Sequence, residues 1–290
     1  MSDSSSLAVV TMAYNEGELL PVWCRHYAAA VGAEQCYVID HGSSDGSTEA
    51  LGGVNRIRIP RSPQDDTRRT RFISEFCASL LNWYDAVIHV DVDELLVADP
   101  DRFPSLAAYA ACVEPGGVRT AIGFDVVHAL DGEPAIDWSR PVSEQRHWLR
   151  FSSAMCKPVL IRRPVAWAPG FHCIDEAPAF DDLYLFHLRY ADQPSGLARL
   201  ARTRRQPWAS AEAGQHQRMP DADWDAMLRG MSGLSRRDDI VLGRDDVTLE
   251  HWLGRVMEST VFRRDELYRL DLHISGDELW RLPSRFIGRF

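Results

Sequence analysis

The first 100 residues alternate between short runs of apolar residues and longer stretches in which apolar residues recur every three or four positions. Short apolar runs indicate buried strands, and the longer spacing indicates amphipathic helices. The predicted strands are 7–12, 36–40, 55–60 and 86–92, and the predicted helices are 16–31, with Asn15 as its N-cap, and 65–83. Such strand–helix–strand repeats predict a Rossmann-like, mostly parallel sheet with helices on both faces.

The pattern becomes mixed after Pro104. Further strands are predicted at 118–128, 156–162 and 183–190, and the chain from about Pro194 onward is mostly helical and charged. We therefore expect two regions, an α/β domain over 1–192 and a mainly helical region over 193–290 that packs against it as an appendage.

Composition narrows the class of protein. The 290 residues are 45% hydrophobic and 26% charged, which is typical of a globular chain. Thirty-two basic and 42 acidic residues leave a net charge of -10. A protein that binds nucleic acid needs a basic surface, so nucleic acid is not the expected partner.

The expected location is the cytoplasm. The polar residues 1–7 lack the layout of a signal peptide, and no apolar run approaches the roughly 20 residues that span a bilayer. The six cysteines are scattered without a CxxC pair, which indicates reduced thiols. These features are compatible with peripheral contact at a membrane surface, and they do not define an oligomeric state.

Three acidic loops follow predicted strands. They are 15–16 after the first strand, 40–48 after the second and 91–94 after the fourth. Ligands of such sheets bind at the carboxyl ends of parallel strands, so we expect the three loops to meet at one edge.

Asp91 and Asp93 are the strongest metal candidates. Alternate residues of a strand share a face, so the two carboxylates are expected on the same side. Two carboxylates with Glu94 beside them would suit Mg²⁺ or Mn²⁺, which could bridge a diphosphate. A solvated acidic turn that ends a strand is the alternative.

Three segments together resemble the family 2 glycosyltransferases. They are TMAYNEGELLPVW (11–23), VIDHGSSDGST (38–48) and HVDVDELL (89–96), and they look closest to a bacterial branch with the DVDE form of the DxD motif. The resemblance covers about the first 100 residues, and extends more loosely to Asp192. It implies a GT-A fold, a nucleotide-sugar donor and a divalent cation.

The resemblance also implies roles for single residues. Asn15 and Glu16 match the first loop that contacts the nucleoside, and Asp40 matches the acid that reaches the base or ribose. Asp45 matches an acid that supports the second loop, although a turn-forming acid is an equal alternative because Ser-x-Asp-Gly favours turns. Asp91, with Asp93, matches the DxD pair and would contact the nucleotide-sugar.

His187 is the expected third metal ligand, because many GT-A enzymes take a histidine from a late strand. A lone histidine in an apolar run is otherwise a buried structural residue. His172 is the competing candidate.

Groups for the diphosphate and for catalysis are less well defined by the sequence. Lys157, the only lysine, is a candidate diphosphate ligand. Of the arginines that open the helix at 65–83, namely Arg68, Arg69 and Arg71, we expect at least two to be solvated. Asp175 and Glu176 are the candidate catalytic bases, since transfer to a hydroxyl needs a carboxylate near the acceptor oxygen.

The sequence departs from the family pattern in one region. It has no clear Glu-Asp pair and no Gln-x-x-Arg-Trp motif. Residues 204–208 (RRQPW) resemble that motif only superficially. That departure, with no spanning segment, predicts a single-addition enzyme over a processive polymerase.

The sequence therefore predicts a metal-dependent, inverting glycosyltransferase that moves a sugar from a nucleotide, with uridine diphosphate as the expected carrier, to a hydroxyl of a glycan or other acceptor. A nucleotidyltransferase is the first alternative, but the acidic loop at 13–17 is unlike a triphosphate-binding loop. A non-catalytic scaffold that binds a nucleotide or glycan is the second.

Overall fold

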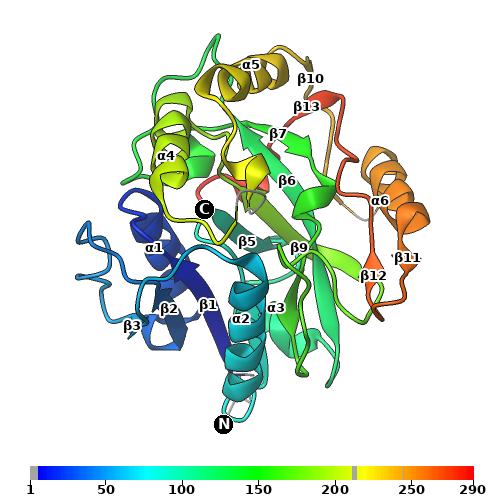
Figure 1. Ribbon diagram of the computed structural model, residues 1–290. Helices are drawn as coiled ribbons and strands as arrows, with labels where there is room; N and C mark the ends of the chain where they lie inside the picture. Colours follow the sequence, from blue (N-terminus) through cyan, green and yellow to red (C-terminus); the bar gives the residue numbers. More distant parts are fainter. Residues whose placement is uncertain (1–5, 211–213, 244) are drawn as a thin grey trace.

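The computed structural model describes residues 6–210, 214–243 and 245–290, and its centre is a four-stranded parallel sheet (Figure 1). The strands are β1 (Leu7–Ala13), β2 (Cys36–Asp40), β3 (Asn55–Arg58) and β4 (Ala86–His89). They lie in the order β3-β2-β1-β4, and every pair is parallel. The predicted parallel sheet is confirmed, and the bounds of β2 are those predicted.

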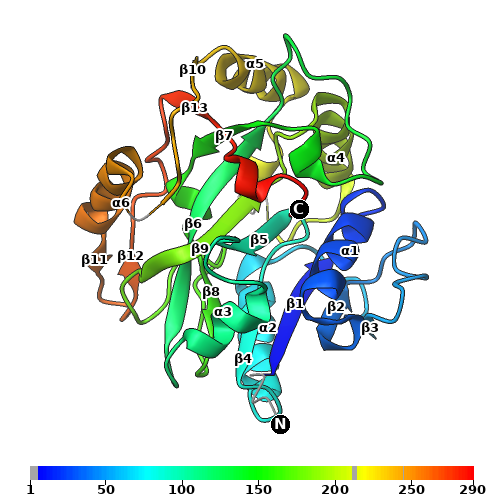
Figure 2. The same cartoon turned by 180° about the vertical axis from the view of Figure 1, so that it is seen from behind.

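Helices cover both faces of this sheet, as Figures 1 and 2 show from opposite sides. Alternate residues of β1 face opposite ways. Val9 belongs to the same buried cluster as Trp23 of α1 (Leu19–Val31). Val10 packs in the cluster that contains Ile73 of α2 (Asp66–Leu80). The α/β class is therefore the observed one.

The start of α1 differs from the prediction. Glu18, not Asn15, occupies the N-cap position. Asn15 instead has a left-handed backbone with φ 54°, which a short polar side chain tolerates. The helix begins three residues later than predicted because the preceding loop uses Asn15 for its own geometry.

The second half of the sheet is mixed. Its strands are β5 (Glu94–Ala98), β6 (Val118–Val127), β7 (Trp148–Phe151), β8 (Pro158–Ile161) and β9 (Phe180–His187). Strand β8 joins β4 to β6 through antiparallel pairs, whereas β6 and β9 are parallel. Strand β5 and the helix α3 (Leu106–Cys112) were not predicted from the sequence.

The C-terminal region contains α4 (Gln193–Arg205), α5 (Asp221–Ser232) and α6 (Val247–Ser259). It also contributes β10 (Ser235–Arg237) and β13 (Glu278–Arg281), which extend the main sheet beside β7. Strands β11 (Val261–Phe262) and β12 (Tyr268–Arg269) form a separate hairpin. Residues 193–290 therefore share the sheet of the first region and are not helical throughout.

Short 3-10 turns complete the fold at Ala33–Gln35, Val142–Glu144, Ser153–Met155, Gln215–Gln217 and Ser284–Phe286. Among the described residues, no helix combines the length and the apolar character that crossing a bilayer requires.

Candidate functional site

The DVDE segment forms a turn between two strands. Strand β4 ends at His89, and β5 begins at Glu94. The N–H of Glu94 donates to the carbonyl of Asp91 over 3.1 Å, and the N–H of Asp91 donates to Oε2 of Glu94 over 2.9 Å. The expectation that Asp91 and Asp93 share one strand face is wrong, because the alternation of a strand does not apply to a turn.

Asp91 faces two cations. It pairs with Arg69 of α2, and Nζ of Lys157 lies 3.2 Å from its Oδ2. Lys157, directly before β8, also binds the buried carboxylate of Glu94. Burial alone would lower the pKa of Lys157, but Glu94 and Asp91 outweigh it and raise that pKa, so the ammonium stays charged. Arg68 and Arg71 are exposed, as predicted for two of the three helix arginines.

Asp93 faces His187 and a different arginine. Nε2 of His187 lies 3.3 Å from Oδ2 of Asp93, and Arg199 of α4 pairs with the same oxygen. Nδ1 of His187 lies 2.7 Å from Oδ1 of Asp125. Burial lowers the pKa of His187, but the charge of Asp93 and the hydrogen bonds to Asp125 and Asp93 overcome this and raise it to about 9. His187 is thus held as a cation between two carboxylates.

Asp125 was not identified from the sequence. It is paired in register with His187 across the parallel strands β6 and β9, and both side chains are buried. The available signal was an acid inside the apolar run of β6, because a buried carboxylate needs a partner.

Arg199 and Arg202 were also not identified. Both arginines of α4 bind Glu16, at 3.0 and 3.1 Å. They tie the loop after β1 to a helix more than 180 residues away in the sequence. Glu16, Asp93 and His187 are therefore connected, because Arg199 binds both acids and His187 lies beside Asp93. This agrees with the prediction that the first and third acidic loops lie near each other.

Asp40 organises the loop that follows β2. Its Oδ1 accepts from the N–H of Ser43 over 2.7 Å, and its Oδ2 accepts from Thr48 over 3.0 Å. Arg56 and Arg58 of β3 contact the same Oδ2 at 2.7 and 2.9 Å. Burial would raise the pKa of Asp40, but these hydrogen bonds lower it overall. The carboxylate is fully buried, and its contacts are with its own loop and strand β3.

Asn15 connects the first two acidic loops. Its N–H donates to Oγ of Ser43 over 3.1 Å, and its Oδ1 accepts from the N–H of Ser44 over 2.8 Å. Asp45 accepts from the N–H of Ser47 over 3.0 Å and from its hydroxyl over 2.6 Å. Asp45 is exposed. Its two hydrogen bonds from Ser47 are those of a turn-forming acid, the alternative role expected from the Ser-x-Asp-Gly sequence.

Substitution of Asp40 tests its two roles. We expect Asp40→Ala to weaken nucleoside diphosphate binding with or without metal, as the resemblance implies. Because the N–H of Ser43 and the hydroxyl of Thr48 lose a buried acceptor, we also expect a loss of stability of about 1–3 kcal/mol. Calorimetry measures the first effect and urea unfolding the second. Unchanged nucleotide affinity in a folded variant would remove Asp40 from the nucleotide site.

The candidate bases lie in an ion pair. Asp175 and Glu176 each bind Arg163 at 2.9 Å. Arg163 follows β8, whereas Lys157 precedes it, so the two cations are at opposite ends of that strand. The structure therefore brings Asp175 and Glu176 to Arg163, whereas the ion pairs of Asp91 and Asp93 are with Arg69, Lys157, His187 and Arg199. His172 lies in the same loop and lines a small cavity with Glu176.

The fit of a divalent cation rests on Asp93 and His187. Two atoms that bind one cation at about 2.1 Å in neighbouring positions lie roughly 3 Å apart, close to the 3.3 Å between Oδ2 of Asp93 and Nε2 of His187. The hydrogen bond that Nδ1 of His187 donates to Asp125 is the usual support of a histidine ligand. Within 6–210, 214–243 and 245–290, no three acidic, histidine or cysteine side chains are already gathered as a site. Mg²⁺ commonly takes many of its ligands from substrate phosphates and water. Asp93 and His187 would therefore form a partial site that a bound diphosphate completes, once His187 has lost its proton.

Comparison with known proteins gives no family. No family model matches the chain, and no curated protein matches it. Solved structures that match include a mycobacterial protein, at 17% identity over 44% of each chain with a TM-score of 0.30. A mannose-1-phosphate geranyltransferase from Thermus thermophilus matches at 13% identity, with 78% of this chain, 65% of that chain and a TM-score of 0.30.

A third matching structure is a CMP:2-keto-3-deoxy-manno-octonic acid synthetase complexed with CTP. It has 13% identity, covers 78% of this chain and 87% of that chain, and has a TM-score of 0.28. The chain spans less than two thirds of the first two structures. Similarity at this level assigns no activity, so the function has to be argued from the site.

Proposed function

We propose that the protein is a metal-dependent glycosyltransferase that takes a sugar from a nucleotide-sugar and transfers it to an acceptor hydroxyl. The observation that supports this most directly is the Asp93–His187–Asp125 arrangement at the carboxyl edge of the parallel strands. A carboxylate, an imidazole and a supporting acid at that edge suit a hard divalent cation beside a phosphate. The segments that resemble family 2 glycosyltransferases supply the loops around it.

Each group of residues has a distinct part in the proposal. Asp93 and His187 would hold Mn²⁺ or Mg²⁺, which would offset the negative charge of the departing nucleoside diphosphate. Arg69, Lys157 and Arg199 surround the acids and supply positive charge for the phosphate oxygens. Each of these cations is already paired with an acid, so a phosphate would join or replace an existing ion pair.

The loops after β1 and β2 would bind the nucleoside. Asn15 fixes the two loops to each other, and Asp40 holds the second one closed on β3. Glu16 is held by Arg199 and Arg202, so movement of α4 would change the loop and the metal ligands together.

For removal of the proton from the acceptor hydroxyl, we propose the residues that the sequence predicts. Asp175 and Glu176 are the candidate bases, and release of either from Arg163 would be needed before it could accept a proton. We propose inverting, single-addition transfer, with uridine diphosphate as the carrier. The inverting outcome and the uridine carrier depend on the resemblance to the family 2 glycosyltransferases.

A thermal-shift screen tests the proposal. The intact chain is mixed with nucleoside diphosphates, each with and without Mn²⁺, and a true ligand raises the melting temperature by mass action. Nucleotide-sugars that carry the matching base are then assayed for metal-dependent release of free nucleoside diphosphate. Release of pyrophosphate from a nucleoside triphosphate and a sugar phosphate would show a nucleotidyltransferase instead. Binding without turnover would show a scaffold.

The charge on His187 predicts a pH dependence of stability. Its pKa is raised from 6.5 to about 9 in the folded protein, so its contribution is complete below pH 6.5 and is lost as pH rises through 9. The shift corresponds to about 3 kcal/mol. We expect metal-free protein to lose most of this stability between pH 6.5 and pH 9.5, measured by urea unfolding. His187→Gln should flatten that interval, and an equally steep loss in His187→Gln would show that other groups cause it.

A further inference from the structure

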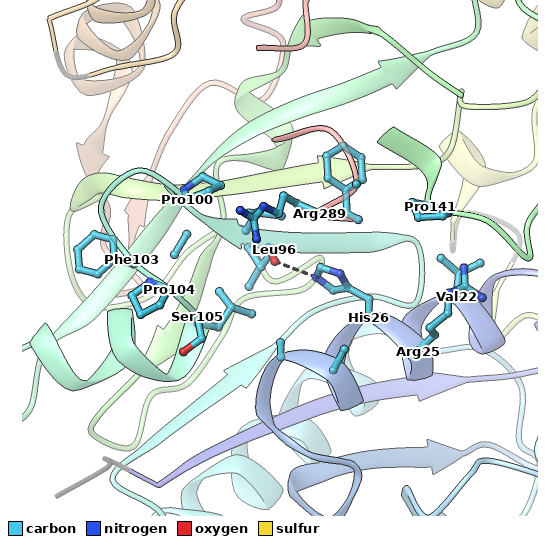
Figure 3. Close-up of a pocket in the computed structure, with 17 residues that line it drawn as sticks. Val22, Arg25, His26, Leu96, Pro100, Phe103, Pro104, Ser105, Pro141 and Arg289 are labelled. Atoms are coloured by element: carbon cyan, nitrogen blue, oxygen red, sulfur yellow. Dashed lines mark hydrogen bonds between the residues drawn. The ribbon is translucent and has the colours of Figure 1, made fainter. Parts of the chain in front are cut away.

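A cavity of about 350 Å³ lies between α1, β5 and the C-terminal segment (Figure 3). Its walls include residues of α1 from Val22 to Ala30, residues of β5 from Leu96 to Ala98, and the segment that leads into α3. None of the acids of the candidate functional site lines it. The cavity is therefore a separate feature of the molecule.

The lining is mostly apolar. Phe103, Pro104 and Leu106 contribute from the segment before α3 and its first turn, and Val22 and Leu96 contribute from α1 and β5. In the view of Figure 3, Phe103 and Pro104 group on one side of the cavity. An apolar concavity of a few hundred Å³ with a few polar groups is the usual form of a small-molecule site.

The floor of the cavity is electrically neutral. His26 of α1 lies with Nε2 2.9 Å from the carbonyl of Leu96, as the dashed line in Figure 3 marks. Burial lowers the pKa of His26 to about 4, so its ring is uncharged near neutral pH. The imidazole joins α1 to β5 and does not supply charge to a ligand.

Positive charge is supplied by two arginines. Arg25 and Arg289 are the charged residues of the lining, and none of its seventeen residues is Asp or Glu. Arg25 already donates to the carbonyl of Trp138 over 2.9 Å. Arg289 is exposed, and no hydrogen bond or ion pair of its side chain occurs within the described parts of the chain. Arg289 is thus a cation beside an apolar cavity with no acid of the lining to balance it.

We propose that this cavity binds a small amphipathic anion, with an alkyl chain inside and a carboxylate or phosphate head at Arg289. The volume of about 350 Å³ is at the lower end of the range for small-molecule sites, which suits one short alkyl chain. A cationic head would find no acid in the lining, and a chain without a head would leave Arg289 paired with water alone. The site is independent of the proposed nucleotide site.

A series of ligands tests the apolar part. Calorimetry on the intact chain is carried out with straight-chain carboxylates of six to fourteen carbons, each below its micelle concentration. We expect affinity to rise about fourfold for each added methylene until the cavity is full, and then to level off. A rise that continues without levelling, or no binding by any length, would overturn the proposal.

The head group is tested with matched ligands. Decanoate and decyl phosphate should bind more tightly than decanol, and decylamine more weakly than decanol. The stronger of the two anions identifies the head as a carboxylate or a phosphate. Equal affinity for decanoate, decanol and decylamine would show simple partition into an apolar surface and overturn the proposal.

Two variants locate the ligand. Arg289→Gln should reduce decanoate affinity about threefold and leave decanol affinity unchanged. Arg71→Gln, which changes an exposed arginine on α2, is the matched control and should alter neither. Ala29→Trp, at an exposed position of the lining, should block binding of every chain length while the melting temperature stays near that of the parent. Full decanoate affinity in Ala29→Trp would place the ligand elsewhere. Nucleotide binding, measured in the same samples, reports separately on the proposed function.

Discussion

Asp93→Asn should lower turnover of the nucleotide-sugar by more than tenfold while the fold is retained. The substitution keeps the size of the side chain but removes the charge that faces His187 and Arg199. A neutral amide is a weaker ligand for a hard divalent cation than a carboxylate. The measurement is release of nucleoside diphosphate at saturating Mn²⁺, with circular dichroism as the check on folding.

Asp223→Asn is the matched control. Asp223 is an exposed acid of α5 with no part in the candidate site, so turnover should stay near that of the parent. If Asp93→Asn retains more than about a tenth of the activity, a loss below ~1.4 kcal/mol of transition-state stabilisation, Asp93 does not bind the metal. Loss of metal dependence as well as rate would strengthen the assignment.

Lys157→Met should cost roughly 3–5 kcal/mol of unfolding free energy, the largest stability effect that the site predicts. Methionine fills most of the space of the lysine stem but leaves Glu94 buried without its cation. Asp91 is less affected because Arg69 remains beside it. Urea unfolding at pH 7 measures the loss.

The double variant Lys157→Met with Glu94→Gln identifies the cause. Removal of both charges of a buried pair is far less costly than removal of one, so the double variant should recover most of the lost stability. An unrecovered loss would mean that the lysine stem, and not its charge, stabilises the fold. A Lys157→Met protein as stable as the parent would show that Glu94 takes up a proton or a new partner at little cost.

The sequence by itself determined the parallel sheet and the helices that cover it. Apolar runs such as 36–40 are local patterns, and their meaning does not depend on the rest of the chain. The same holds for the position of acidic loops after strands, which follows from strand order and the short connections of the fold. The first loop meets the second through Asn15, and α4 joins Glu16 to Asp93.

Local pattern was insufficient at the DVDE segment. The apolar pattern of 86–92 predicts one continuous strand. In the structure, β4 ends at His89, the chain turns, and β5 begins at Glu94. The turn is set by hydrogen bonds between Asp91 and Glu94, and by Lys157, which approaches from 63 residues further on. Alternation along a strand could not show this because the cation that decides it is not local.

Only the tertiary structure decided which side chains complete the site. Asp125 meets His187 because β6 and β9 pair in parallel, and Arg199 meets Asp93 because α4 packs across the edge of the sheet. Each pair is separated by 62 residues or more in the sequence. A buried carboxylate needs a cation or hydrogen-bond donor as a partner, but the local sequence does not show which residue that partner is. The long-range pairing of strands and helices makes that choice, and with it the charge of the site.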